Sequence, residues 1–303
     1  MLASQCESRA ETPGWTNVTV PTPFVSEGAA AVFDSARNCI VWHDGNTTWE
    51  WDGMAWEHRA TGGPVWRRDH AMAYDSARAR VVLFGGQLNY GNPYYGDTWE
   101  WDGVAWTQVA STGPTPRANH AMAYDAATGT TVLFGGSGPG YSGDMWEWNG
   151  SVWTQRIVPG PSSRAQLAMA YDSARGKIVL FGGGPVWSTP TDSATWEWDG
   201  TTWTPLSVPG PVPRRQHGLA FDSSLGRTVL FGGSDGVASL GDTWEWDGIA
   251  WALQSSSGPA PRTDHAMAFD SVRGQVFLFA GATDCPGGRA DHGAFHPSRA
   301  VPL

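Results

Sequence analysis

The sequence predicts an all-β protein, a six-bladed β-propeller with four antiparallel strands in each blade. Two observations predict this fold. The stretch Trp99-Glu100-Trp101-Asp102-Gly103-Val104-Ala105-Trp106 has close copies beginning at Trp49, Trp146, Trp196 and Trp244, about 47 to 50 residues apart, a period typical of a repeated supersecondary unit. The 303 residues also include 19 Trp, 39 Gly and 21 Pro but only 16% charged residues, a composition that favours turn-rich β-structure packed with aromatic side chains.

Each repeat contains four predicted strands. The first alternates small and large residues, the second is apolar, the third carries the Trp-Glu-Trp motif, and an Asp-Gly turn leads to the fourth. A sheet that is apolar on both faces must be covered by neighbouring sheets, which a propeller provides. In the second repeat the strands are His70 to Tyr74, Val81 to Phe84, Asp97 to Trp101 and a strand that begins at Trp106.

The blade count follows from copies of the first strand near Ala29, His70, His120, Leu167, His217 and His265. We expect one propeller domain over residues 1–285, with blade cores near 29–56, 70–106, 120–153, 167–203, 217–251 and 265–281 plus 14–20, and an irregular tail over 286–303. Alanines such as Ala71 and Ala73 suit the innermost strand, where the blades converge.

The two ends of the chain are expected to meet in the last blade. No copy of the Trp-Glu-Trp motif follows Cys285, but Trp15 aligns with the tryptophans that open the fourth strands. We therefore expect Gly14 to Val20 to be the fourth strand of the last blade and to close the ring. The third strand of that blade aligns with Ser8 to Glu11, and the tail after Cys285 is the alternative.

Three recurring features resemble kelch repeats. They are the Gly-Gly pairs at 85–86, 135–136, 182–183 and 232–233, the Trp that opens each fourth strand, and Pro-x-x-Arg or Pro-x-Pro-Arg-x-x-His before each first strand. The resemblance covers residues 15 to 281 and implies a kelch propeller similar to the central domain of the galactose-oxidase-like group. It also implies that the loops before the first strands and after the second strands meet at the mouth of the central channel.

Five arginines recur at this mouth: Arg67, Arg117, Arg164, Arg214 and Arg262. Guanidinium groups bind carboxylates and acidic sugars through two parallel hydrogen bonds, and some kelch proteins hold acidic peptides in this way, so one hypothesis is an anion-binding ring. The alternative is that each arginine satisfies backbone carbonyls or a carboxylate between blades. Residues present in every repeat usually serve packing, which favours the second role.

Residues that break the symmetry are better candidates for ligand contacts. Before the first strands the mouth carries five varied polar residues, Asp69, Asn119, Gln166, Gln216 and Asp264. The loops after the second strands differ in length and contain aromatic residues, namely Tyr90, Tyr94, Tyr95, Tyr141 and Trp187. Loop aromatics of this kind stack on sugars or grip peptides, although they would equally serve as lids over the blades.

Other repeated motifs are interpreted as structural. The five glutamates of the Trp-Glu-Trp motifs are equivalent, whereas a general acid and base need different environments, so pairing between blades with arginines such as Arg78, Arg175 or Arg273 is favoured. The Asp-Gly pairs lack the alternating oxygen ligands of a calcium loop. Three scattered cysteines, Cys6, Cys39 and Cys285, form neither a disulfide framework nor a zinc site. We assign no catalytic residue, metal or cofactor.

Three hypotheses for the function follow. The first is a non-catalytic, monomeric binding propeller for a protein segment or glycan, with acidic ligands favoured by the arginines. The second is a carbohydrate-active enzyme of the kelch kind, such as a copper oxidase, which the resemblance implies would need two Tyr, two His and a Cys. The third is a fragment of a larger secreted protein.

Charge and the first residues limit the partners and the compartment. A net charge of −10 argues against nucleic acid and anionic membranes as partners, and no apolar run is long enough for membrane insertion. Residues 1 to 12 do not resemble a signal peptide, so the compartment stays undetermined, and the protein would be extracytoplasmic if the chain is a fragment of a secreted one.

Overall fold

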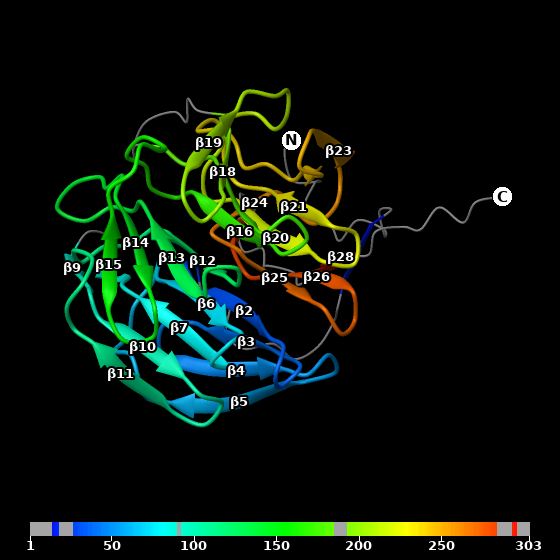
Figure 1. The fold of residues 1–303 in the computed structure, drawn as a ribbon. Coiled ribbons are helices and arrows are strands. Elements are labelled where there is room, and N and C mark those ends of the chain that lie inside the picture. Colours follow the sequence, from blue (N-terminus) through cyan, green and yellow to red (C-terminus); the bar gives the residue numbers. More distant parts are fainter. Residues whose placement is uncertain (1–13, 18–26, 90–91, 185–192, 284–292, 296–303) are drawn as a thin grey trace.

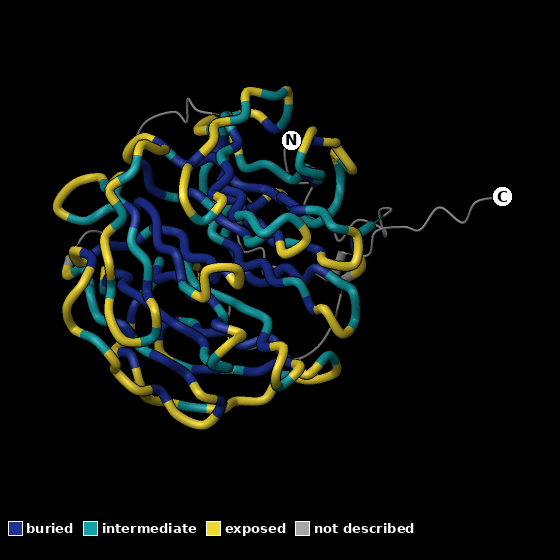
Figure 2. Tube along the Cα trace, viewed as in Figure 1, coloured by how far each residue is buried: buried dark blue, intermediate teal, exposed yellow. Residues whose placement is uncertain are grey.

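The computed structural model describes residues 14–17, 27–89, 92–184, 193–283 and 293–295. These residues contain strands and turns and no helix. They form a β-propeller of four-stranded antiparallel blades. In Figure 1 the strands β2 to β5 step outward from the centre of the molecule to its edge, and Figure 2 shows the buried inner strands and the exposed outer turns.

Five blades are each built from one contiguous segment, in the predicted strand order. Blade 1 comprises β2 (Ala30–Asp34), β3 (Cys39–His43), β4 (Thr47–Trp51) and β5 (Trp56–Thr61). Blade 2 comprises β6 (Ala71–Asp75), β7 (Arg80–Phe84), β10 (Thr98–Trp101) and β11 (Trp106–Ala110). Blade 3 comprises β12 (Ala121–Asp125), β13 (Thr130–Phe134), β14 (Met145–Trp148) and β15 (Trp153–Arg156). Blade 4 comprises β16 (Ala168–Asp172), β17 (Lys177–Phe181), β18 (Thr195–Trp198) and β19 (Trp203–Leu206), and blade 5 comprises β20 (Gly218–Asp222), β21 (Arg227–Phe231), β22 (Thr243–Trp246) and β23 (Trp251–Ser255).

The number of contiguous blades is one fewer than the six predicted. The remaining four-stranded sheet, here called the terminal sheet, contains β25 (Ala266–Asp270), β26 (Gln275–Phe279), β28 (Gly293–Phe295) and β1 (Trp15–Asn17). Its third position is occupied by β28, which lies in the tail after Cys285, and the other candidate, Ser8 to Glu11, lies outside the described residues. Two short pairs complete the structure, β8 (Gln87–Asn89) with β9 (Asn92–Tyr94) and β24 (Arg262–Thr263) with β27 (Ala282–Thr283).

Neighbouring blades pack a face of large side chains against a face of small ones. Met122 and Tyr124 of blade 3 lie against Ala71 and Ala73 of blade 2 in one buried cluster, and the other blade pairs repeat the arrangement. The sequence suggested that small residues line the inner strands. The structure shows small residues on one face of these strands and large residues on the other. Alanine is needed only on the face that receives the next blade, because a larger residue there would overfill the contact.

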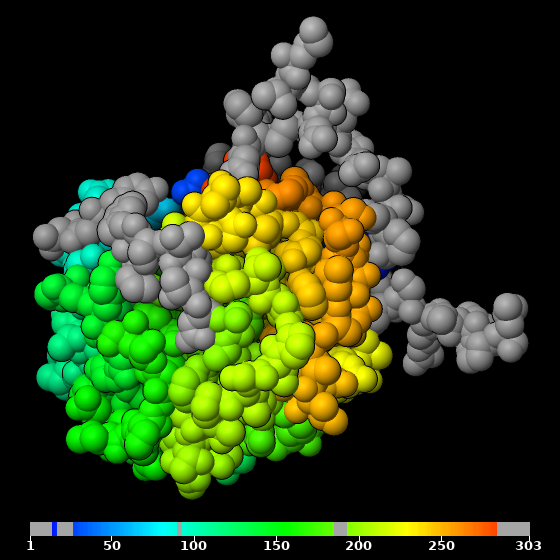
Figure 3. All heavy atoms as spheres, turned by 90° about the horizontal axis from the view of Figure 1, so that it is seen from above, coloured from blue at the N-terminus to red at the C-terminus, as the bar shows by residue number. Residues whose placement is uncertain are grey.

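The repeated tryptophans are packing residues. The second Trp of each motif, such as Trp101, is fully buried and tilts against the fourth-strand Trp106 with ring centroids 5.7 Å apart. Trp106 then donates a hydrogen bond from Nε1 to Thr48 Oγ1 of the preceding blade, at 2.7 Å. Seen from above, the successive segments lie side by side on the surface, from green through yellow to orange in Figure 3.

Candidate functional site

Two faces of the propeller carry different sets of residues. On the first, here called the mouth face, the chain entering each inner strand pairs with the chain leaving the second strand, as in the bridges between Arg68 and Gln87 and between Ala118 and Ser137. On the opposite face, here called the turn face, lie the turns between first and second strands and the Asp-Gly turns. Of the fifteen predicted ligand-binding positions, the thirteen that the structure describes belong to the mouth face.

The five predicted arginines are buried, with exposed fractions of 2% or less. Arg117 donates from Nη1 and Nη2 to the two carboxylate oxygens of Asp144, at 2.5 and 2.9 Å, and from Nη1 to the carbonyl of Gly135 at 3.0 Å. Arg67 and Arg214 hold Asp97 and Asp242 in the same way, and Arg164 and Arg262 bind the carbonyls of Gly182 and Ala280.

These contacts replace the predicted anion-binding ring by a structural role. Arg67, Arg117 and Arg214 each join the Gly-Gly segment after the second strand to the start of the third strand, so each organises its own blade. Burial alone would raise the pKa of Asp144, but the hydrogen bonds from Arg117 and Trp146 and the charge of Arg117 outweigh burial and lower it. The arginines are therefore occupied by internal carboxylates and carbonyls.

The five predicted polar residues come together around the propeller axis. Asp69, Asn119, Gln166, Gln216 and Asp264 all adopt left-handed backbone conformations, with φ between 53° and 59°, and Gly28 takes the same place in blade 1 at 72°. Each backbone N–H donates to the carbonyl of the preceding member: Asp69 to Gly28, Asn119 to Asp69, Gln166 to Asn119, Gln216 to Gln166, Asp264 to Gln216, and Gly28 to Asp264. We call these six residues the axial ring.

The residues of the axial ring are partly exposed and adopt a sparsely populated backbone conformation, although the side chain of Asp69 itself is only 8% exposed. Left-handed backbone costs a residue with a Cβ about 1 kcal/mol or more, and strain of this kind clusters at functional sites. The carboxylates of Asp69 and Asp264 accept 2.6 Å hydrogen bonds from Gln87 and Gln216. Burial, and next the neighbouring charge of Asp69, raise the pKa of Asp264 to about 7.

The predicted loop aromatics do not form one cluster in the described residues. The ring of Tyr95 lies 4.3 Å from the guanidinium of Arg67, so this residue packs over the blade. Tyr94 lies on the β8–β9 hairpin and is half-buried, and Tyr141 is 42% exposed. Tyr90 and Trp187 lie outside the described residues.

Four histidines before the inner strands, and His43 in blade 1, are buried between blades. His120 packs edge-on against Phe84 of the preceding blade, and Leu167 takes the equivalent place in blade 4. Burial, and next the charge of Arg117, lower the pKa of His120 to about 3; burial likewise lowers the pKa of His265 to about 3 and of His43 to about 4, and those of His70 and His217 fall well below the usual value. The five histidines therefore act as neutral packing residues, in agreement with Leu167 at the equivalent position of blade 4.

The central channel contains a cavity of about 330 Å³ that the sequence did not reveal. Its walls are the inner strands, with a layer of Met72, Met122 and equivalent residues and a layer of aromatic side chains that includes Tyr74, Tyr124 and Phe221. Ser173, Ser223 and Ser271 also line it. Since these serines belong to the turns that follow the inner strands, the cavity lies toward the turn face, away from the axial ring.

Comparisons with protein-family models and with curated proteins find no match to this chain. Within the described ranges, no three His, Cys, Asp or Glu side chains are grouped closely enough to hold a metal ion. The same part of the chain contains no helix of the length and apolarity needed to cross a membrane.

The arginine contacts predict a large effect on stability. Replacing Arg117 by Ala removes the charged donor of the Asp144 carboxylate and the side-chain donor to the Gly135 carbonyl, so we expect the free energy of unfolding to fall by about 3–5 kcal/mol in urea titrations. Arg156→Ala is the control, because this side chain is 38% exposed and lies 3.7 Å from Glu147; it should change stability by less than about 1 kcal/mol. Equal urea midpoints for the two variants would contradict the structural role.

The buried histidines predict a loss of stability in acid. Their pKa values are lower in the folded protein than in the unfolded chain, where they lie near 6.5. Stability is therefore complete above about pH 6.5 and falls as the pH drops toward 3 to 4. From pH 7 to 5 each such histidine should cost about 2 kcal/mol, from the 1.36 kcal/mol carried by one pKa unit.

His120→Leu, which copies Leu167, isolates the contribution of one histidine. It should reduce the acid-induced drop in the free energy of unfolding by about 2 kcal/mol at pH 5. Parallel stability–pH curves for this variant and the wild type would show that His120 does not contribute to the acid-induced loss of stability.

Proposed function

We propose that this protein is a non-catalytic binding propeller that recognises a protein segment or a glycan on its mouth face. The observation that carries the proposal is the axial ring. Its backbone conformation recurs in every blade, yet its residues differ in kind and stay partly exposed. Packing between blades does not require ring side chains that differ from blade to blade, whereas binding of a ligand without sixfold symmetry does.

The chemistry of the axial ring favours a neutral polar ligand. The preference for acidic ligands depended on the arginines, whose guanidinium groups are bound internally. The side chains that remain at the axis are amides and carboxyl groups, which donate to and accept from hydroxyl groups and peptide bonds. The half-buried Tyr94 and the exposed Tyr141 stand on neighbouring loops, where they would add stacking contacts.

The role of the axial ring in binding can be tested by removing its side chains without changing its backbone conformation. Asn119→Gly and Gln166→Gly remove two ring side chains, keep the left-handed backbone, as Gly28 does naturally, and leave the hydrogen bond from Gln216 to Asp264 intact. We expect folding stability to be unchanged or higher and binding to ligands found on glycan and peptide arrays to weaken at least about tenfold, because two or more hydrogen bonds are lost.

Met54→Ala is the matched control for this test. Met54 is 83% exposed in a turn of the opposite face, so this variant should bind normally. Undiminished binding by the ring variants would refute the site. Stoichiometric copper in the purified protein would instead favour the alternative, a kelch-type oxidase.

We also propose that the propeller is of the kelch type and closes as a six-bladed ring through the terminal sheet. Three contacts support closure. β28 pairs with both β26 and β1, Trp15 Nε1 donates to Thr243 Oγ1 of blade 5 as Trp106 does to Thr48, and β25 lies beside β2 of blade 1. The Gly-Gly pairs and the arginines before the inner strands support the kelch type.

Closure predicts that Trp15 stabilises the fold as much as Trp106. Alanine at either position should lower the free energy of unfolding by about 3–5 kcal/mol, because each indole is buried between blades and hydrogen-bonded. Amide hydrogen exchange gives an independent readout, since Thr16 should be protected by its pairing with Ala294. Rapid exchange at Thr16, with a small effect of Trp15→Ala, would mean that the ring is open.

A further inference from the structure

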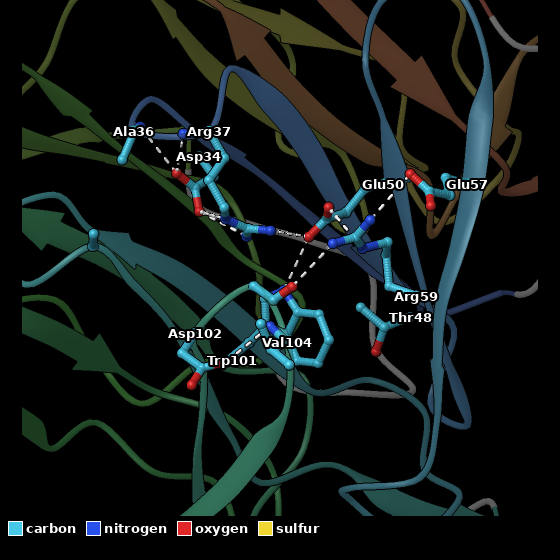
Figure 4. A network of polar contacts seen from close by, with 12 residues as sticks. Asp34, Ala36, Arg37, Thr48, Glu50, Glu57, Arg59, Trp101, Asp102 and Val104 are labelled. Atoms are coloured by element: carbon cyan, nitrogen blue, oxygen red, sulfur yellow. Dashed lines mark hydrogen bonds and ion pairs between the residues drawn. The ribbon is translucent and has the colours of Figure 1, made fainter.

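An arginine bridges two carboxylates on the turn face of three blades. In blade 2, Arg78 Nε donates to Asp75 Oδ2 at 2.6 Å and its Nη1 to Glu100 Oε1 at 2.7 Å. Figure 4 shows the same bridge in blade 1, where Arg37 lies between Asp34 and Glu50. The equivalent residues in blade 4 are Asp172, Arg175 and Glu197.

The next blade completes a fitted slot around each of these guanidinium groups. Trp148 Nε1 of blade 3 donates to Glu100 Oε1 at 3.1 Å, so the same carboxylate oxygen serves both blades. The guanidinium also lies against the Asn149-Gly150 turn of blade 3. A Cβ on Gly150 would stand 2.7 Å from Arg78 Cζ, so the turn accepts the arginine only because residue 150 is glycine.

Blade 5 keeps both carboxylates of the slot, Asp222 and Glu245, but has Leu225 in place of the arginine. Asp222 Oδ1 accepts hydrogen bonds from Ser224 and the Leu225 amide. Asp222 Oδ2 is the atom that binds arginine in the filled slots. Here it is buried and has no hydrogen-bond partner among the described residues, and the side chain is fully enclosed. A buried carboxylate oxygen without a donor is costly.

Blade 3 repeats the vacancy, with Asp125, Glu147 and, in place of the arginine, Thr128. Trp198 of blade 4 stands where Trp148 stands in the filled slot, but within the described part of the chain its buried Nε1 has no partner. Below Gly200 the nearest atom is Thr128 Cγ2, at 3.1 Å, in place of a guanidinium.

The glutamates of the two empty slots also differ from those of the filled slots. Glu100 and Glu197 are buried beneath their arginines, whereas Glu147 and Glu245 are partly exposed. Burial raises the pKa of both Glu147 and Glu245, and so does the charge of the neighbouring aspartate. The charges of Arg156 and Arg227, respectively, act in the opposite direction and lower it. In neither slot do the described residues supply a bridging arginine, although Arg156 lies 3.7 Å from Glu147 in blade 3.

We propose that the empty slots of blades 3 and 5 bind guanidinium groups, namely arginine side chains of another polypeptide. The filled slots define the geometry, with one N–H directed to the aspartate and one to the glutamate. In the filled slots the bridging arginines remain 26–31% exposed, so a guanidinium in this position reaches solvent, whereas the aspartates beneath it, such as Asp222, are enclosed. The net charge of −10 attracts basic partners. The tryptophan N–H, a donor only, makes the slot a poor ligand set for a metal ion.

The direct test is an NMR titration of the intact protein with Nα-acetyl-arginine amide. We expect saturable shifts of the Trp198 indole N–H and of the Ser224 and Leu225 amides in the millimolar range, with at least about threefold weaker binding of Nα-acetyl-lysine amide, which lacks the planar fork. Absence of saturable shifts, or equal responses to the two probes, would overturn the proposal. Tighter binding of free arginine than of the amide would overturn a polypeptide source in favour of a metabolite.

Variants that exchange filled and empty slots provide the controls. Leu225→Arg and Thr128→Arg should each raise the Tm and abolish the probe response of their own slot while sparing the other. Arg175→Leu empties the slot of blade 4, and the probe should restore part of the lost Tm. If neither arginine variant folds, Glu245→Gln serves instead and should weaken binding in blade 5 alone. Retained binding in that variant, or no rescue of Arg175→Leu, would overturn the proposal. These slots lie on the turn face, so their failure leaves the mouth-face function untouched.

Discussion

Contact between neighbouring blades is the constraint on which the whole structure depends. Each sheet is apolar on both faces and can exclude water only when a neighbour stands on either side. The chain meets this need with one arrangement, large side chains such as Met122 and Tyr124 against the alanines of the blade before. The hydrogen bonds from fourth-strand tryptophans to threonines of the preceding blade fix the depth at which the blades engage.

Within each blade, buried ionic contacts do the work that side-chain packing does between blades. The clamp of Arg117 on Asp144 holds two segments that the variable loop separates, and the bridge of Arg78 holds two strands at the opposite face. Charged groups buried in this way are expensive to break and leave little freedom in geometry. Ligand recognition is therefore expected where the repeat relaxes, at the side chains of the axial ring and at the slots without an arginine.

Much of the fold could be predicted from the sequence because the repeat fixes the strand order, the turns and the buried tryptophans. The pairing of Glu100 with Arg78 was also predicted, but as a contact between blades, whereas both residues belong to blade 2. The role of the mouth arginines could not be predicted, because their partners stand about 30 residues away and burial is a tertiary property. The available signal was the aspartate two residues before the first Trp of the motif, as at Asp97. Leu167 likewise indicated that the histidine position is apolar. The substitutions at Thr128 and Leu225 were visible, but their meaning required the unpaired atoms around them.

The backbone hydrogen bonds of the axial ring run in one direction and return to their starting point at Gly28. Such a circuit has no first donor and no last acceptor, unlike the ends of a helix or the edges of an open sheet. An open array of repeats can lose structure progressively from its terminal units. Here, removing any one member exposes a polar group on each of two neighbours. The axial ring therefore holds side chains of different blades at fixed spacing, while the loops around them vary.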